Sequence, residues 1–242
     1  AKASADGYTV LITTNTTHAA NEHLYNKLGY DPVKDFSPVT GLSKGGQVMV
    51  VRAEAPYKSV TDLIAKAKKE PGKVSFGSGS ASSRVAGELF QQMTQTTLLH
   101  VPYKGNPNAI TDLLGGQIDF MITDTATGLP HLKAGKLRAL GASTLKRLPV
   151  MPTLATLDEL GVKGYDMSYW FAAYVPANTP APVVAKLREL IVAGLQSLGA
   201  KSFFEATGAE PWTSTPEELA KFQVSESAKW GKIIRAAGIE KE

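Results

Sequence analysis

The chain has 242 residues, of which 43% are hydrophobic and 20% are charged, and its formal net charge is +4. These values are typical of a globular protein with one or two cores, and the dispersed lysines form no run of the kind that binds nucleic acid. The absence of cysteine excludes disulfides, thiolate metal sites and cysteine nucleophiles. No apolar run approaches the roughly 20 residues of a membrane-spanning helix.

Strands and helices are predicted to alternate along the chain. Apolar and β-branched runs predict strands at residues 8–13, 47–52, 73–76, 98–101, 118–122, 137–142 and 169–175. Helical spacing and capping residues predict helices at 19–28, 58–69, 106–114, 183–198 and 203–207, further helices from about 84, up to 133 and from 215, and an irregular segment at 146–164. This alternation predicts an α/β fold with a mostly parallel sheet.

A turn rich in glycine and serine follows the strand at 73–76 and precedes a helical pattern. Backbone N–H groups at such a helix start, together with hydroxyl donors, suit a carboxylate or a phosphate. Arg84 adds a planar pair of donors that matches a carboxylate. The competing interpretation is that Ser82 or Ser83 only caps the helix and that the glycines only form the turn.

Three other polar turns, at 14–18, 103–105 and 123–125, also follow predicted strands. Ligands of α/β sheets bind at the carboxyl ends of strands, so we expect all four turns to face a common cleft. Asp124 could act as a base or bind an ammonium group, or it could only cap a helix. Trp170 could be a ligand platform or a core residue.

Signals for catalysis are weak. The four histidines show no spacing typical of zinc. The Ser-x-x-Lys pattern at 143–146 lacks an accompanying nucleophile elbow, and the glycines at 77 and 79 lack the remainder of a nucleotide-binding fingerprint. We therefore expect no catalytic residues, no metal and no cofactor, with an α/β hydrolase as a less favoured alternative.

Blocks along nearly the whole chain carry a family resemblance. They include Asp-Gly-Tyr-Thr at 6–9, Thr-Asn-Thr-Thr-His at 14–18, Gly-Glu-Leu-Phe at 87–90, His-Val-Pro-Tyr-Lys-Gly at 100–105 and Asp-Leu-Leu-Gly-Gly-Gln at 112–117, with further blocks at 30–36, 130–131, 134–139, 152–153 and 209–211. In these blocks the chain resembles the periplasmic solute-binding receptors of tripartite tricarboxylate transporters, the TctC or Bug family.

The resemblance implies a two-lobed, type II-like periplasmic binding protein whose lobes close on a small mono-, di- or tricarboxylate. It implies an exported, periplasmic monomer that delivers its ligand to a membrane permease and has no nucleic-acid partner. A sensor of the same fold that signals to a two-component kinase is the main alternative. We expect lobe 1 to comprise residues 1–46 and 168–242, lobe 2 residues 47–167, and the hinge strands to lie near 48–52 and 139–142.

The ligand contacts that the turns and the resemblance together imply are Thr14, Asn15, Thr16, His18, Gly77, Ser78, Gly79, Ser80, Ser82, Ser83, Arg84, Tyr103, Lys104, Asp124 and Trp170. The family often carries histidine where this chain has Arg84, so this arginine is expected either to select a second carboxylate or to point to solvent. The resemblance also implies a strand, a turn and a helix ahead of residue 6. We therefore expect this N-terminal strand–helix unit to be missing here, with weakened binding and an exposed sheet edge if the chain is a fragment.

Overall fold

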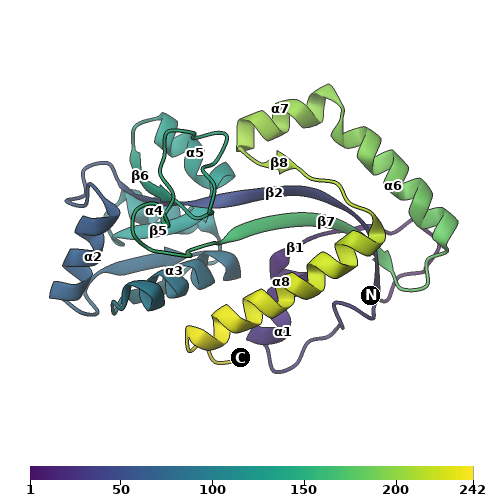
Figure 1. Cartoon of the computed structure of the whole chain (residues 1–242), viewed down its shortest axis with the longest axis horizontal. Coiled ribbons are helices and arrows are strands. Elements are labelled where there is room, and N and C mark those ends of the chain that lie inside the picture. The colour runs from purple at the N-terminus through teal and green to yellow at the C-terminus, as the bar shows by residue number, and fades with distance from the viewer. Residues whose placement is uncertain (242) are drawn as a thin grey trace. The chain divides into compact units, whose positions relative to one another are not determined.

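A computed structural model describes residues 1–241, and its internal contacts divide the chain into two compact units (Figure 1). Unit 1 comprises Ala1–Lys44 with Trp170–Glu242, and unit 2 comprises Gly45–Tyr169. Two strands, β2 (Phe36–Arg52) and β7 (Ser168–Pro176), cross the boundaries between the units. Within residues 1–241 no helix is both long enough and apolar enough to span a membrane. The lobe boundaries expected from the sequence, after residues 46 and 167, remain a prediction.

Unit 1 contains antiparallel strand pairs and helices, and most of its helical residues come from its second segment, Trp170–Glu242. Its elements, besides its parts of β2 and β7, are β1 (Leu11–Thr14), a π-helical turn η1 (Thr16–Ala20), α1 (Asn21–Leu24), α6 (Ala181–Leu195), α7 (Leu198–Thr207), β8 (Glu210–Pro211) and α8 (Pro216–Ala236). β1 pairs with β7, with Leu11 opposite Tyr174. α8 begins as the sequence predicts, because Thr215 and Glu218 form a reciprocal capping box.

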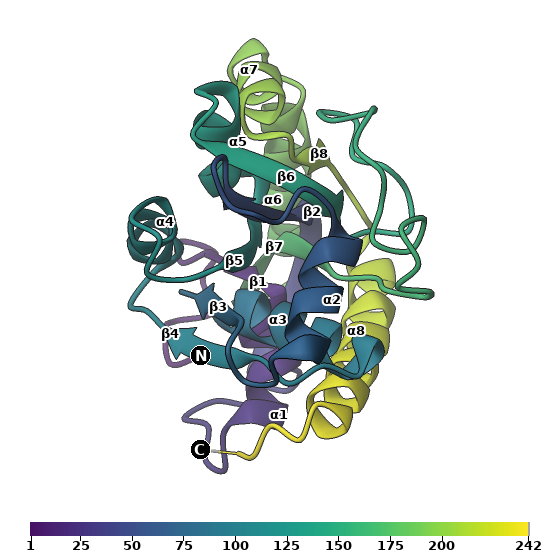
Figure 2. The same ribbon diagram turned by 90° about the vertical axis from the view of Figure 1, so that its left-hand side faces the viewer.

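Unit 2 is an open sheet covered by helices on both faces. Its elements are the second part of β2, α2 (Val60–Lys69), β3 (Ser75–Ser78), α3 (Ala81–Thr94), β4 (Leu99–Pro102), α4 (Asn106–Leu114), β5 (Phe120–Asp124), α5 (Thr125–Lys133) and β6 (Leu137–Ala142). Met121 of β5 packs with Ile110 and Leu113 of α4, whereas its neighbour Phe120 packs against Phe90 of α3. Because neighbouring strand residues point to opposite faces, α3 and α4 cover different sides of the sheet (Figure 2).

The mixed α/β, two-lobed class expected from the sequence is confirmed, but the expectation of a mostly parallel sheet is wrong. The pairings of β3 with β4 and with β5 are parallel, whereas β1 runs antiparallel to β7 and β2 runs antiparallel to β5, β6 and β8. Most of these antiparallel pairs involve β2. β2 is a single long strand that begins at Phe36 and serves both units, where the sequence suggested a loop followed by a short strand at 47–52.

Helix boundaries in unit 1 also differ from the prediction. The helix expected at 19–28 is the π-helical turn followed by α1, which ends at Leu24 because Tyr25 adopts an extended backbone. The helix expected at 203–207 begins earlier, at Leu198, where the Ser197 hydroxyl accepts a hydrogen bond from the Ala200 N–H. A local polar cap therefore marks where α7 begins.

Candidate functional site

Three loops of unit 2 meet at the carboxyl ends of β3, β5 and β4, which lie side by side in that sheet (Figure 2). Each strand leads directly into a helix, so the N-termini of α3, α4 and α5 lie at the same edge. A Cβ atom at Gly79 would overlap the backbone of Gly105 and Asn106, so glycine is what allows two of these loops to touch. The Gly79 N–H donates to Asn106 Oδ1 at 3.1 Å, and Asn106 Nδ2 donates to Asp124 Oδ2 at 2.9 Å. A single side-chain amide thus joins all three loops.

The start of α3 carries the serines of the predicted anion site. Ser80 is the helix cap, since its Oγ accepts a hydrogen bond from the Ser83 N–H at 3.2 Å. The alternative of a cap at Ser82 or Ser83 is therefore wrong. Ser83 is fully buried and its Oγ donates to the Ile122 carbonyl at 2.6 Å, so this hydroxyl ties α3 to β5. Ser82 is partly exposed, and its Oγ lies 3.1 Å from Ser80 Oγ.

Ser78 and His100 form a pair across β3 and β4. Ser78 is buried and its Oγ lies 2.7 Å from His100 Nε2, while the imidazole stacks on Phe76 with the ring centroids 4.9 Å apart. Burial, with a smaller contribution from the positive charge of Arg84, lowers the pKa of His100. The lowered pKa favours the neutral imidazole at pH 7, and the positive charge of Arg84 acts on this end of the sheet. Gly77 is buried beside Ile118, where a Cβ atom would overlap that side chain.

The loops after β4 and β5 supply the remaining candidates of unit 2. The Tyr103 N–H donates to the Ser78 carbonyl at 2.7 Å, and the Tyr103 hydroxyl donates to Asp112 Oδ2 at 2.9 Å. Burial together with this bond raises the pKa of Tyr103 to about 12. Lys104 is exposed. Asp124 caps α5 by accepting from the Thr127 N–H at 2.8 Å, which is the structural interpretation left open for it by the sequence.

The polar turn at 14–18 lies in unit 1, between β1 and α1. Asn15 and His18 are each 1% exposed, and the amide nitrogen Nδ2 of the former and Nε2 of the latter have no hydrogen-bond partner within residues 1–241. The His18 ring lies among aromatic side chains, 4.2 Å from the Tyr174 ring centroid. Burial lowers the pKa of His18 to about 4, so this imidazole is neutral at pH 7. Thr14 and Thr16 are only partly buried.

Trp170 is the remaining candidate of unit 1. It is 1% exposed, and its indole Nε1 donates to Glu226 Oε2 at 3.2 Å in the core of unit 1. The interpretation of Trp170 as a core residue is therefore the one that its surroundings support. The described residues include no cluster of three or more histidine, aspartate or glutamate side chains that could hold a metal ion.

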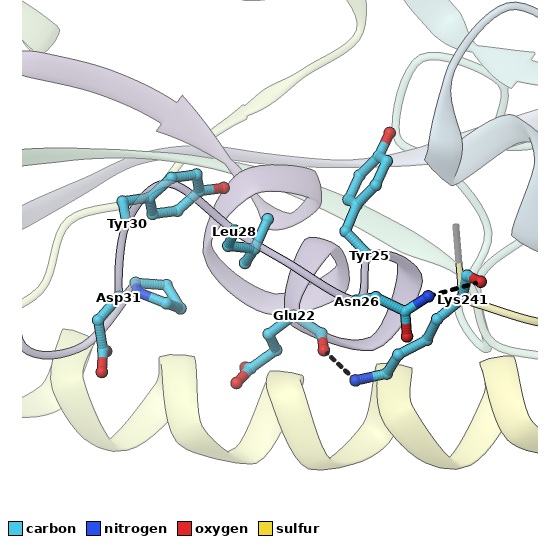
Figure 3. A pocket seen from close by; sticks show the side chains of 8 residues that line it. Glu22, Tyr25, Asn26, Leu28, Tyr30, Asp31 and Lys241 are labelled. Carbon is cyan, nitrogen blue, oxygen red and sulfur yellow. Dashed lines mark hydrogen bonds between the residues drawn. The ribbon is translucent and has the colours of Figure 1, made fainter.

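A shallow polar hollow beside α1 is a separate feature of unit 1 (Figure 3). Lys241 lies across it, with Nζ donating to the Glu22 carbonyl at 2.8 Å and its own carbonyl accepting from Asn26 Nδ2 at 3.2 Å. Tyr25 and Tyr30 line the same hollow. None of the ligand contacts predicted from the sequence lines this hollow.

Two polar residues of this site in unit 2 were not predicted from the sequence. His100 was assessed only as a metal ligand, and Asn106 was assessed only as the start of a helix. An amide directly after Gly105 at a helix start is a recognisable local signal. Its two partners, however, lie 27 and 18 positions away in the chain, and no local pattern indicates them.

Comparison with known proteins connects this geometry to a family. The model of the tripartite tricarboxylate transporter family receptor matches residues 1–239. The chain is 32% identical over 241 residues to Protein BugT of Bordetella pertussis, covering 98% of this chain and 74% of BugT.

Solved structures show the same fold. Rpa4515 of R. palustris, solved with adipate, superposes with a TM-score of 0.93 at 34% identity, covering 100% of this chain and 81% of that one. MatC (Rpa3494) from Rhodopseudomonas palustris, solved with bound malate, superposes with a TM-score of 0.86 at 26% identity, covering 96% of this chain and 81% of that one. The resemblance noted in the sequence is thereby confirmed, and the chain belongs to the tripartite tricarboxylate transporter family of receptors.

Proposed function

We propose that this protein is a periplasmic receptor that captures a small carboxylate and passes it to the membrane permease of a tripartite tricarboxylate-type transporter. The convergence of three helix N-termini in unit 2, joined through Asn106, is the observation that carries the proposal. Helix N-termini favour anions because their first N–H groups lack partners within the helix and lie at the positive end of the dipole. Adipate in Rpa4515 and malate in MatC, both carboxylates, support the same ligand class.

Within unit 2 we assign the direct contacts to the partly exposed start of α3 and to the loop after β4. Ser80 and Ser82 present hydroxyl groups at the first of these, where the Gly79 N–H already donates to Asn106, and Lys104 adds an exposed positive charge at the second. Arg84 lies one position beyond the buried Ser83 and contributes positive potential. Ser78, Ser83 and Asp124 are assigned to holding the loops, because their side chains already bond to protein groups.

Within unit 1 we assign the candidate contacts to Thr14, Asn15 and Thr16. Asn15 supports this assignment because a buried amide nitrogen without a protein partner is costly unless a water molecule or a ligand satisfies it. His18 is assigned to packing, since its neutral ring is enclosed by aromatic side chains. The proposal includes no catalytic step and no cofactor.

Thermal unfolding against a panel of carboxylates tests the proposal. The panel contains adipate, malate, succinate, citrate and aspartate, with the matching neutral amides as controls. A ligand present at ~1,000 times its dissociation constant stabilises the folded state by about 4 kcal/mol, which is roughly 8–16 °C for a chain of this size. Such a shift with a carboxylate and none with its amide supports the receptor. Equal responses to acid and amide, or none to any member of the panel, would contradict it.

A further inference from the structure

The two strands that connect the units are held at one place in unit 1. Lys44 on β2 is the last residue of unit 1 before the chain enters unit 2, and Trp170 on β7 is the first after it returns. Both side chains contact α8, and in each case the contact lies within unit 1. Both points at which the chain crosses between the units therefore lie next to α8.

Lys44 is enclosed by aromatic rings. Its Nζ lies 3.7 Å from the centroid of a Trp212 ring and 4.0 Å from that of Phe222, and these two side chains pack with centroids 4.8 Å apart. Such a cation–π arrangement stabilises more when the ammonium group is partly removed from water. Burial lowers the pKa of Lys44, and the charge of Glu226 opposes this shift. A Cβ atom at Gly41 would overlap the Trp212 ring, so this ring packs directly on the backbone of β2.

Trp170 reaches the same part of α8 from the other strand. Its Nε1 donates to Glu226 Oε2 at 3.2 Å, and its ring meets Phe222 edge to face with centroids 5.5 Å apart. Glu226 is only 7% exposed, so this hydrogen bond to a charged group is shielded from water. Phe222 and Glu226 are four positions apart and lie on one side of the helix. One turn of α8 therefore contacts both connecting strands.

On the unit 2 side of this boundary, β2 continues with two glycines. Gly45 and Gly46 follow Lys44 directly, and neither carries a side chain that could lock its backbone. They pack against Tyr169 and Leu148, where a Cβ atom would overlap the neighbouring side chain. Glycine within a strand weakens it and often marks a bend.

We propose that Phe222 and Glu226 form a hinge clamp that fixes both connecting strands at Lys44 and Trp170, so that movement between the units is taken up by the backbone beyond these two residues. The clamp works through contacts inside unit 1, and it is independent of which ligand the protein binds. Loosening it allows the strands themselves to move, which widens the range of inter-unit distances.

Double electron–electron resonance tests the clamp, and the absence of native cysteine makes labelling simple. The inter-unit pair is Lys68→Cys with Glu205→Cys, both at exposed helical positions. A second pair, Glu205→Cys with Lys232→Cys, lies entirely in unit 1 and reports whether that unit stays intact. Both pairs are measured without ligand in the wild-type background and in Lys44→Met and Trp170→Phe backgrounds.

We expect each clamp variant to broaden the inter-unit distance distribution by about 1.5-fold or more while the pair inside unit 1 is unchanged. Lys186→Met, which removes an exposed lysine from α6, is the matched control and should leave both distributions as in the wild type. An unchanged inter-unit distribution in either folded clamp variant would overturn the proposal. So would equal broadening of both label pairs, because that result indicates loosening of unit 1 itself. If Lys44→Met does not fold, Trp170→Phe, which removes only the N–H donor and part of the ring, decides the test.

Discussion

Asn106 Nδ2 lies 2.9 Å from Asp124 Oδ2, and this bond links the loops that follow β4 and β5. The same side chain accepts a hydrogen bond from the N–H of Gly79 through its Oδ1. The shape of the candidate anion site therefore depends on a residue that need not touch the ligand.

Replacing Asn106 with aspartate tests this dependence. The variant keeps an acceptor for Gly79 but places a second carboxylate beside Asp124 and removes the donor, so we expect a loss of about 1–3 kcal/mol of unfolding free energy. Urea denaturation at pH 7 measures the loss. Asn108→Asp, at an exposed position on the same helix, is the control and should change stability by less than about 0.5 kcal/mol. Equal stability of the two variants would contradict the linking role.

Ser82 and Ser83 are neighbours with different predicted roles. Ser83→Ala removes the hydroxyl that donates to the Ile122 carbonyl and should cost about 1–3 kcal/mol of unfolding free energy. Ser82→Ala should leave stability within about 0.5 kcal/mol and instead reduce the thermal shift produced by the best carboxylate of the panel. Calorimetric unfolding with and without that carboxylate separates the two effects. A Ser82→Ala variant with full ligand response would remove this serine from the proposed site.

Gly79 permits the contact between the loops after β3 and β4. Gly79→Ala should cost at least about 1–3 kcal/mol, because the added methyl group overlaps backbone atoms that cannot rotate away. Gly194→Ala is the matched control: its added Cβ would meet nothing within 4 Å in α6. Removing a helix glycine should stabilise by about 0.5–1 kcal/mol. In urea denaturation we expect Gly79→Ala to lower the unfolding free energy and Gly194→Ala to raise it. An unchanged unfolding free energy in Gly79→Ala would show that the loops can separate freely.

His18 predicts a pH dependence of stability. Its pKa in the folded protein is about 4, below the ordinary histidine value of 6.5, so the unfolded chain binds the proton more readily. Stability is therefore complete above pH 6.5 and falls as the pH decreases toward 4, by up to about 3 kcal/mol. In His18→Phe, which keeps an aromatic ring beside Tyr174, this part of the pH dependence should disappear. Parallel slopes for wild type and variant between pH 6.5 and 4 would contradict the assignment.

Local patterns predicted several elements because their causes are local. The capping boxes at Ser59 and Thr215 each use a partner three positions away, and the two helices begin within two residues of the expected starts. The run at 137–142 forms a strand with the expected bounds. The serine-rich turn after β3 does open a helix, although Ser80 rather than Ser82 or Ser83 is the cap.

Contacts between distant segments decided the rest. The length and direction of β2 follow from partners in both units, and a sequence window cannot show that one strand serves two sheets. The surroundings of His18 and Trp170 are likewise set by Tyr174 and Glu226, which lie far along the chain. The burial of both side chains is why we assign them to packing.

The sequence by itself determined the order of strands and helices, the polar turns at the strand ends and the family, because these follow from short-range spacing and from blocks of residues in a fixed order. The tertiary structure decided which hydroxyls and amides are already bonded within the protein. Ser83 and Asp124 are occupied by the fold, whereas Asn15 has a buried amide nitrogen without a partner among residues 1–241. The physical reason is that a hydrogen bond depends on distance in space, and folding brings together groups that are remote along the chain.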